Sequence, residues 1–175
     1  MSKALCIIAA IGILLLPAFT NAEPIMEYNA GDWEFILAGS GTSDNSFDTT
    51  TLSVQGGAGY FYTDNIELGI KQGISISDLN DGSSWGASTR FSLDYNFNIR
   101  NLKPFIGVNV GYLYGDDVKD TFIAGPEGGI KYGLNSTTFI YTQVEYQILF
   151  ENADEIDNQF DDGRYVYTIG MGIKF

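Results

Sequence analysis

Apolar and polar side chains alternate along eight separate segments of this chain, and no other pattern limits its fold as strongly. Successive side chains of a β-strand point to opposite faces of a sheet, so this alternation predicts strands with one apolar face. After residue 22 no segment shows a convincing helical period. The sequence therefore predicts an all-β fold with strands over residues 32–41, 51–63, 65–74, 85–98, 103–115, 121–133, 137–150 and 163–175.

The first 22 residues have the pattern of a secretory signal peptide. Lys3 supplies the positive charge, residues 4–16 form an uncharged and almost wholly apolar run, and Thr20-Asn21-Ala22 places small residues at a cleavage site. The apolar run is shorter than the roughly 20 residues that a transmembrane helix needs. We expect residues 1–22 to be removed, together with Cys6, and residues 23–175 to form one domain.

The charge of the chain excludes several classes of function. It has 9 Lys+Arg against 22 Asp+Glu, a formal net charge of -13, and no His. Nucleic-acid phosphates would be repelled by such a chain. The absence of His removes the commonest general base and metal ligand. We therefore expect no nucleic acid, no enzymatic activity, no catalytic residues and no bound cofactor or metal within the fold.

The connections between the predicted strands alternate in length. Short connections fall at residues 63–65, 99–102 and 134–136, and mostly longer, acidic ones at 42–50, 75–84, 116–120 and 151–162. An even number of strands places both termini on the side of the short turns. These features predict an eight-stranded antiparallel up-and-down transmembrane β-barrel. Pro126 cannot donate to a strand ladder, so we expect a bulge at Gly125-Pro126.

Alternation alone leaves open which face looks outward, because a soluble lipocalin-like barrel has its apolar face inside and a membrane barrel has it outside. Aromatic residues near both ends of the strands favour the membrane barrel. The charges on the polar face also balance, as a confined interior requires, because an unpaired buried charge is costly. These ten residues are expected to form a structural ion-pair network in the lumen: Glu34, Glu67, Lys71, Arg90, Asp94, Glu127, Lys131, Glu145, Arg164 and Lys174. Any of the five acids could be the partner of Arg90.

Two segments, Gly59–Gly69 and Gly125–Asn135, resemble strand–turn–strand pieces of the small OmpA/OmpX-like outer-membrane barrel family. The end of the chain resembles the C-terminal assembly signal of outer-membrane proteins, carried by Tyr165, Tyr167, Ile169, Met171, Ile173 and Phe175. The resemblance implies a monomer in the outer membrane of a Gram-negative cell, with both termini in the periplasm. Its implied partners are outer-membrane lipid, lipopolysaccharide and the outer-membrane assembly machinery.

The longer connections carry a strong excess of acids, with Lys119 as their only base. These acids are Asp44, Asp48, Asp78, Asp81, Asp116, Asp117, Asp120, Glu151, Asp154, Glu155, Asp157, Asp161 and Asp162. They are interpreted as a solvated surface. Oxygen ligands also suit Ca²⁺ or Mg²⁺, so divalent cations could bridge these loops to lipopolysaccharide or order the last loop.

Two functions remain open. The sequence favours a non-enzymatic outer-membrane protein with a structural or surface-interaction role and acidic extracellular loops. The alternative is a narrow channel, or porin, for ions or small apolar molecules, in which the lumen charges would line a path.

Overall fold

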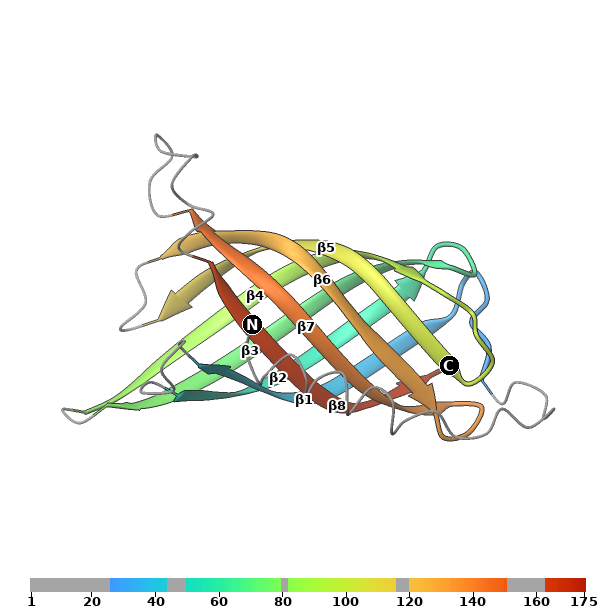
Figure 1. The fold of residues 1–175 in the computed structure, drawn as a ribbon, viewed down its shortest axis with the longest axis horizontal. Coiled ribbons are helices and arrows are strands. Elements are labelled where there is room, and N and C mark those ends of the chain that lie inside the picture. The colour runs from blue at the N-terminus through green and yellow to red at the C-terminus, as the bar shows by residue number, and fades with distance from the viewer. Residues whose placement is uncertain (1–25, 44–49, 80–81, 116–119, 151–162) are drawn as a thin grey trace, which may run out of the picture.

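The computed structural model describes residues 26–43, 50–79, 82–115, 120–150 and 163–175. Its strands form a closed antiparallel barrel in which each strand pairs with its neighbours in sequence (Figure 1). The predicted signal peptide, residues 1–22, lies outside the described residues. The strands are β1 (Trp33–Ser43), β2 (Thr50–Phe61), β3 (Ile66–Leu79), β4 (Gly82–Asn96), β5 (Leu102–Gly115), β6 (Thr121–Gly133), β7 (Thr138–Phe150) and β8 (Arg164–Lys174).

The barrel closes between its first and last strands. β1 pairs with β8 from Glu34↔Lys174 to Thr42↔Val166, and Trp33 and Phe175 exchange two backbone hydrogen bonds of 2.9 Å. Closure leaves no strand edge unpaired, as a sheet in a non-polar solvent requires. Among the described residues no helix is long and apolar enough to cross a bilayer.

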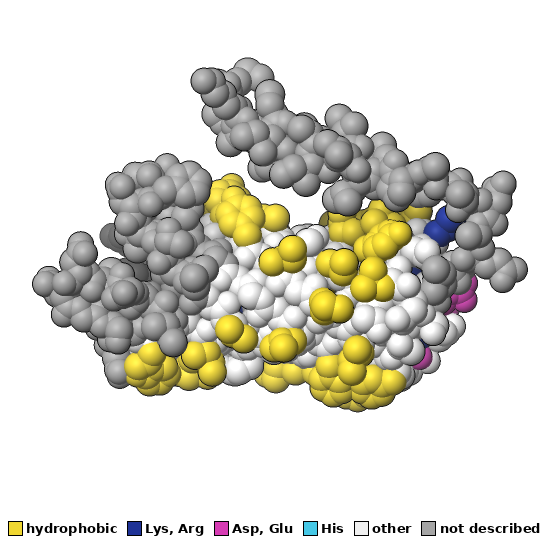
Figure 2. Space-filling model, turned by 90° about the horizontal axis from the view of Figure 1, so that it is seen from below, with side chains coloured by type: hydrophobic (Ala, Val, Ile, Leu, Met, Phe, Trp, Pro, Cys, Tyr) yellow, Lys and Arg dark blue, Asp and Glu magenta, His cyan; other side chains and the backbone are white. Residues whose placement is uncertain are grey.

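The apolar face of the sheet lies on the exterior of the barrel. On β1, Phe35 and Leu37 are 47% and 67% exposed, whereas the alternating residues Glu34 and Ala38 are 0% and 4% exposed. Hydrophobic side chains run along the barrel in the face shown in Figure 2, and the charged side chains visible there lie at one end. The membrane-barrel prediction is confirmed at the level of the fold, and the lipocalin-like arrangement, with its apolar face inside, is wrong.

Aromatic rings on the exterior pair between and along strands. Near the short turns, Trp33 and Tyr60 have ring centroids 5.1 Å apart, and Phe35 stacks on Phe175 at 5.2 Å. At the other end Tyr112 and Phe122 meet at 4.8 Å. Rings at both ends of an aliphatic band match the two interfaces of a bilayer.

The strands follow the predicted segments in order, with the largest difference between β3 and β4. The sequence predicts a loop over residues 75–84, but backbone pairing continues to Leu79↔Gly82. The β3–β4 hairpin therefore extends far at the left end of the barrel in Figure 1. The acidic composition suggested a loop, whereas ladder pairing uses only the backbone and does not need apolar side chains.

The expected bulge at Pro126 is absent. β6 pairs with β7 at Ala124↔Ile148 and again at Glu127↔Glu145, so equal numbers of residues separate the two pairs on each strand. A bulge would place one extra residue on one strand. The proline instead interrupts the ladder without changing the register, while Pro126 still lies opposite Val108 of β5.

Candidate functional site in the barrel lumen

The inward face of the barrel carries a set of buried charges. Alternate residues of all the strands project inward, and an eight-stranded barrel is just wide enough for their side chains to fill it. Charges that leave water must be paired or hydrogen-bonded. The buried charged residues are Glu34, Glu67, Lys71, Arg90, Asp94, Lys103, Glu127, Lys131 and Glu145.

Lys131 organises the layer nearest the short turns. Its Nζ donates to Glu34 Oε1 at 2.8 Å and to Glu67 Oε2 at 2.6 Å. Tyr28 Oη donates to Glu34 Oε2 at 2.6 Å, and Asn96 Nδ2 to Glu67 Oε2 at 3.0 Å. One lysine thus pairs with two carboxylates from β1 and β3, and neutral donors supply further hydrogen bonds.

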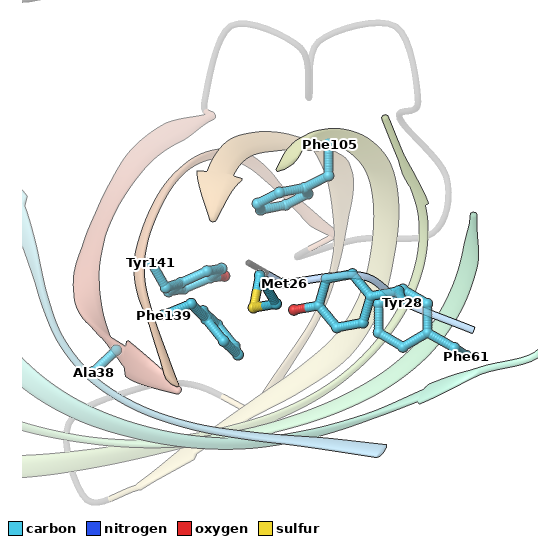
Figure 3. Close-up of a cluster of buried hydrophobic side chains, with 7 residues drawn as sticks. All are labelled: Met26, Tyr28, Ala38, Phe61, Phe105, Phe139 and Tyr141. Carbon is cyan, nitrogen blue, oxygen red and sulfur yellow. The ribbon is translucent and has the colours of Figure 1, made fainter. Parts of the chain in front are cut away.

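An aromatic cluster surrounds the same ammonium group. Lys131 Nζ lies 5.3 Å from the ring centroids of Tyr28 and Phe61, 5.4 Å from Phe105 and 5.9 Å from Phe139. These distances allow cation–π attraction, which strengthens where water is excluded. Figure 3 shows the rings in the barrel interior around Met26. This cluster was not predicted from the sequence, although Phe139 has the same strand parity as the inward Glu145.

The segment before β1 enters the barrel from the short-turn end. Met26 is 0% exposed and Tyr28 is 3% exposed, and both belong to the aromatic cluster. Gly31 N donates to Phe61 O at 2.8 Å, and Lys174 Nζ to Glu27 O at 2.5 Å. The segment therefore covers the lumen at this end. The sequence prediction did not include this segment, although Met26 and Tyr28 alternate with the polar Glu27 and Asn29.

Asp32 anchors this segment at the rim. Its carboxylate accepts hydrogen bonds from Lys174 Nζ at 2.7 Å and from Asn29 N at 2.8 Å. Partial burial opposes ionisation of Asp32, but these hydrogen bonds and the Lys174 charge outweigh it and hold the pKa of the carboxyl below its usual value. Lys174 thus pairs with a rim acid that was not among the ten predicted residues.

The middle of the lumen has two acids and one base. Lys71 forms an ion pair with Glu127 and a 3.2 Å hydrogen bond with Gln143 Oε1. Asn109 Nδ2 donates to Glu127 Oε2 at 2.6 Å. Asp94 accepts a 3.1 Å hydrogen bond from Ser92 and forms no ion pair with the described residues. This layer has more acid than base.

The layer nearest the long connections has the opposite balance. Arg90 forms an ion pair with Glu145 and a hydrogen bond with Gln55 Oε1. Gln147 Nε2 donates to Glu145 Oε1 at 2.8 Å, and its own Oε1 accepts from Arg164 Nε at 2.8 Å. The described part of this layer therefore has two arginines and one carboxylate, and Arg90 is the arginine that contacts it.

The ten predicted residues divide into three groups. Seven form ion pairs within the lumen: Glu34, Glu67, Lys71, Arg90, Glu127, Lys131 and Glu145. Asp94 and Arg164 make hydrogen bonds to neutral side chains, and Lys174 pairs at the rim. Lys103 was missed, although its strand parity matches the inward Phe105 and Asn109.

The predicted assembly signal lies along the exterior of the last strand. Tyr165, Tyr167, Ile169, Met171, Ile173 and Phe175 are all at least half exposed. Of the predicted acidic residues, only Asp78 and Asp120 are described, and the other eleven lie outside the described residues. Within the part that the structure describes, no group of three or more Cys, Asp or Glu could hold a metal ion.

A double-mutant cycle can test the pairing of Arg90 with Glu145. Arg90→Ala and Glu145→Ala should each destabilise the barrel, and the double variant should lose less than the sum of the two, with a coupling of about 1–3 kcal/mol. The same cycle between Arg90 and Glu67, an acid of the layer nearest the short turns, should be nearly additive. Urea unfolding in lipid vesicles measures both, and equal coupling in the two cycles would contradict the layered arrangement.

No protein-family model and no curated protein sequence matches the chain. Solved structures do match. The N-terminal β-barrel domain of Pseudomonas aeruginosa OprF superposes with a TM-score of 0.63 at 19% identity, covering 86% of this chain and 100% of that one. The outer membrane protein OprG from Pseudomonas aeruginosa has a TM-score of 0.63 at 14% identity, covering 86% of this chain and 99% of that one.

Neisserial surface protein A, NspA, matches with a TM-score of 0.60 at 11% identity, over 83% of this chain and 96% of that one. At such identities the likeness concerns the fold, and it agrees with the closed strand order and the apolar exterior. The chain therefore has the fold of the small eight-stranded β-barrels of the Gram-negative outer membrane.

Proposed function

We propose that this protein is a non-enzymatic component of a Gram-negative outer membrane, with a structural or surface-interaction role. The observation that carries the proposal is a lumen filled by ion pairs and aromatic rings inside an apolar exterior. Lys131 is 2% exposed, and Phe61 and Phe139 are 0% exposed, at the level where an axial path would have to pass. A filled lumen favours an anchor over a channel.

The asymmetry of the barrel supports a proposal for its orientation in the membrane. The segment before β1 and Phe175 lie together at the short-turn end, where Trp33 N donates to Phe175 O at 2.9 Å. Barrels of this kind have short turns in the periplasm and longer loops outside the cell. We therefore place both termini in the periplasm and the acidic connections on the cell surface.

The proposed partners follow from this placement. The apolar exterior of the barrel contacts membrane lipid. The aromatic end of β8 engages the outer-membrane assembly machinery. The barrel works as a monomer. The excess acid of the connections supports bridging to lipopolysaccharide phosphates through divalent cations, since carboxylate oxygens suit Ca²⁺ and Mg²⁺.

Fractionation and conductance together test the proposal. The protein should appear in the outer-membrane fraction and migrate differently before and after boiling, because a closed barrel resists detergent unfolding. In planar bilayers the folded form, whose electrophoretic mobility changes on boiling, should give no stable unitary conductance. A reproducible channel from the folded form would favour the porin alternative, and recovery in the periplasmic fraction would overturn the membrane assignment.

A further inference from the structure

A small cavity with a mixed polar and apolar lining lies in the lumen on the side of the long connections. Its volume is about 70 Å³, and Arg90, Arg164 and Gln147 line it together with serines from four strands. The four serines are Ser40, Ser53, Ser75 and Ser88. A cavity of this size holds several bodies the size of a water molecule.

The cavity wall carries positive charge without a carboxylate. Arg90 has its ion pair with Glu145, but within the described residues Arg164 hydrogen-bonds only the neutral amide oxygen of Gln147, at 2.8 Å. Glu145 is not among the residues that line the cavity. Since arginine stays protonated in proteins, two cations stand against one anion among the described residues of this layer.

The middle layer cannot cancel this excess at short range. Its surplus acid, Asp94, is 4% exposed, hydrogen-bonds Ser92 within its own strand and does not line the cavity. The lumen is therefore close to neutral as a whole but divided along its axis. Positive charge lies around the cavity, and the surplus negative charge lies in the middle layer of the lumen.

An unused hydrogen-bond donor lies at the same cavity. Arg90 is 3% exposed, and its Nε has no hydrogen-bond acceptor within the described residues. Ser40, Ser53 and Ser88, which also line the cavity, are half-buried. A buried donor without an acceptor is costly, so an acceptor bound beside Arg90 would stabilise this region.

We infer that this cavity binds a small inorganic anion of halide size. The Arg164 guanidinium supplies the main charge and hydrogen bonds, the serine hydroxyls complete the shell, and Arg90 holds the wall through Glu145 and Gln55. The anion neutralises the charge that Arg164 brings into the barrel. The inference concerns the lumen alone and does not depend on the proposed role in the outer membrane.

Chloride binding to the purified, folded barrel tests the inference. Line broadening of chloride NMR signals should be saturable for the unmodified protein, and bromide should compete. Arg164→Gln should weaken binding roughly tenfold or more, because a charged hydrogen bond is lost. Arg164→Lys should retain most of it.

The matched control is Lys103→Gln, which removes one lumen cation at the opposite end of the barrel. It should leave chloride affinity unchanged. Equal weakening by Lys103→Gln and Arg164→Gln would mean that halide responds to the overall charge, and would overturn the site.

Anomalous diffraction from crystals soaked in sodium bromide gives a readout that needs no variant. A bromide peak among Arg164, Ser53 and Ser88 is the expected result. Water alone in the cavity at saturating bromide would overturn the inference.

Discussion

Lys131→Met should lower the free energy of unfolding by roughly 3–5 kcal/mol, because it leaves two buried carboxylates without their shared cation. Glu34 and Glu67 are 0% and 4% exposed, and Lys131 is the base that forms an ion pair with either of them in the described residues. Methionine keeps most of the side-chain volume, so lost packing contributes little. Urea unfolding in lipid vesicles, followed by the fluorescence of Trp33 and Trp85, measures the effect.

The matched control is Lys174→Met at the rim. The Lys174–Asp32 pair keeps 14% and 21% of its side chains exposed, so its loss should cost about 1 kcal/mol or less. Adding Glu34→Gln to Lys131→Met should restore part of the stability, because one stranded charge is then removed. Equal losses for Lys131→Met and Lys174→Met would show that the inner layer is hydrated and carries no buried charge.

Gly125→Val should block assembly of most of the protein or cost on the order of 3 kcal/mol in the fraction that folds. A Cβ atom at Gly125 would collide with the backbone carbonyl oxygen of Tyr146 on β7. Backbone atoms of a paired strand cannot move aside as a flexible side chain can. The ladder between β6 and β7 is already interrupted here beside Pro126, so little pairing remains to resist separation of the strands.

Gly56→Val on β2 is the matched control for this substitution. Gly56 is exposed on the exterior, and a Cβ atom there meets nothing within 4 Å. The same increase in volume and β propensity should therefore leave assembly intact. The measurement is the fraction of refolded protein whose electrophoretic mobility changes on boiling. Equal fractions for the two valine variants would refute the close approach at Gly125.

Alternation in the sequence determined the number and order of the strands and, with the balance of inward charges, the face that looks outward. The physical reason is local: the side-chain period of a strand is set by its own backbone. The same alternation places Lys103 and Phe139 on the inward face, although neither was predicted to lie there. The bulge predicted at Gly125-Pro126 is absent. Proline removes only its own backbone donor, and the neighbouring strands set the register.

The pairing inside the barrel was decided only by the tertiary structure. Arg90 meets Glu145, which is three strands further along the barrel wall but lies across the same layer of the lumen. Which charges share a layer depends on the stagger of all eight strands together, and no single segment encodes that stagger. The entry of Met26 and Tyr28 beneath Lys131 has the same origin, because the aromatic residues that receive them, Phe61, Phe105 and Phe139, come from three different strands.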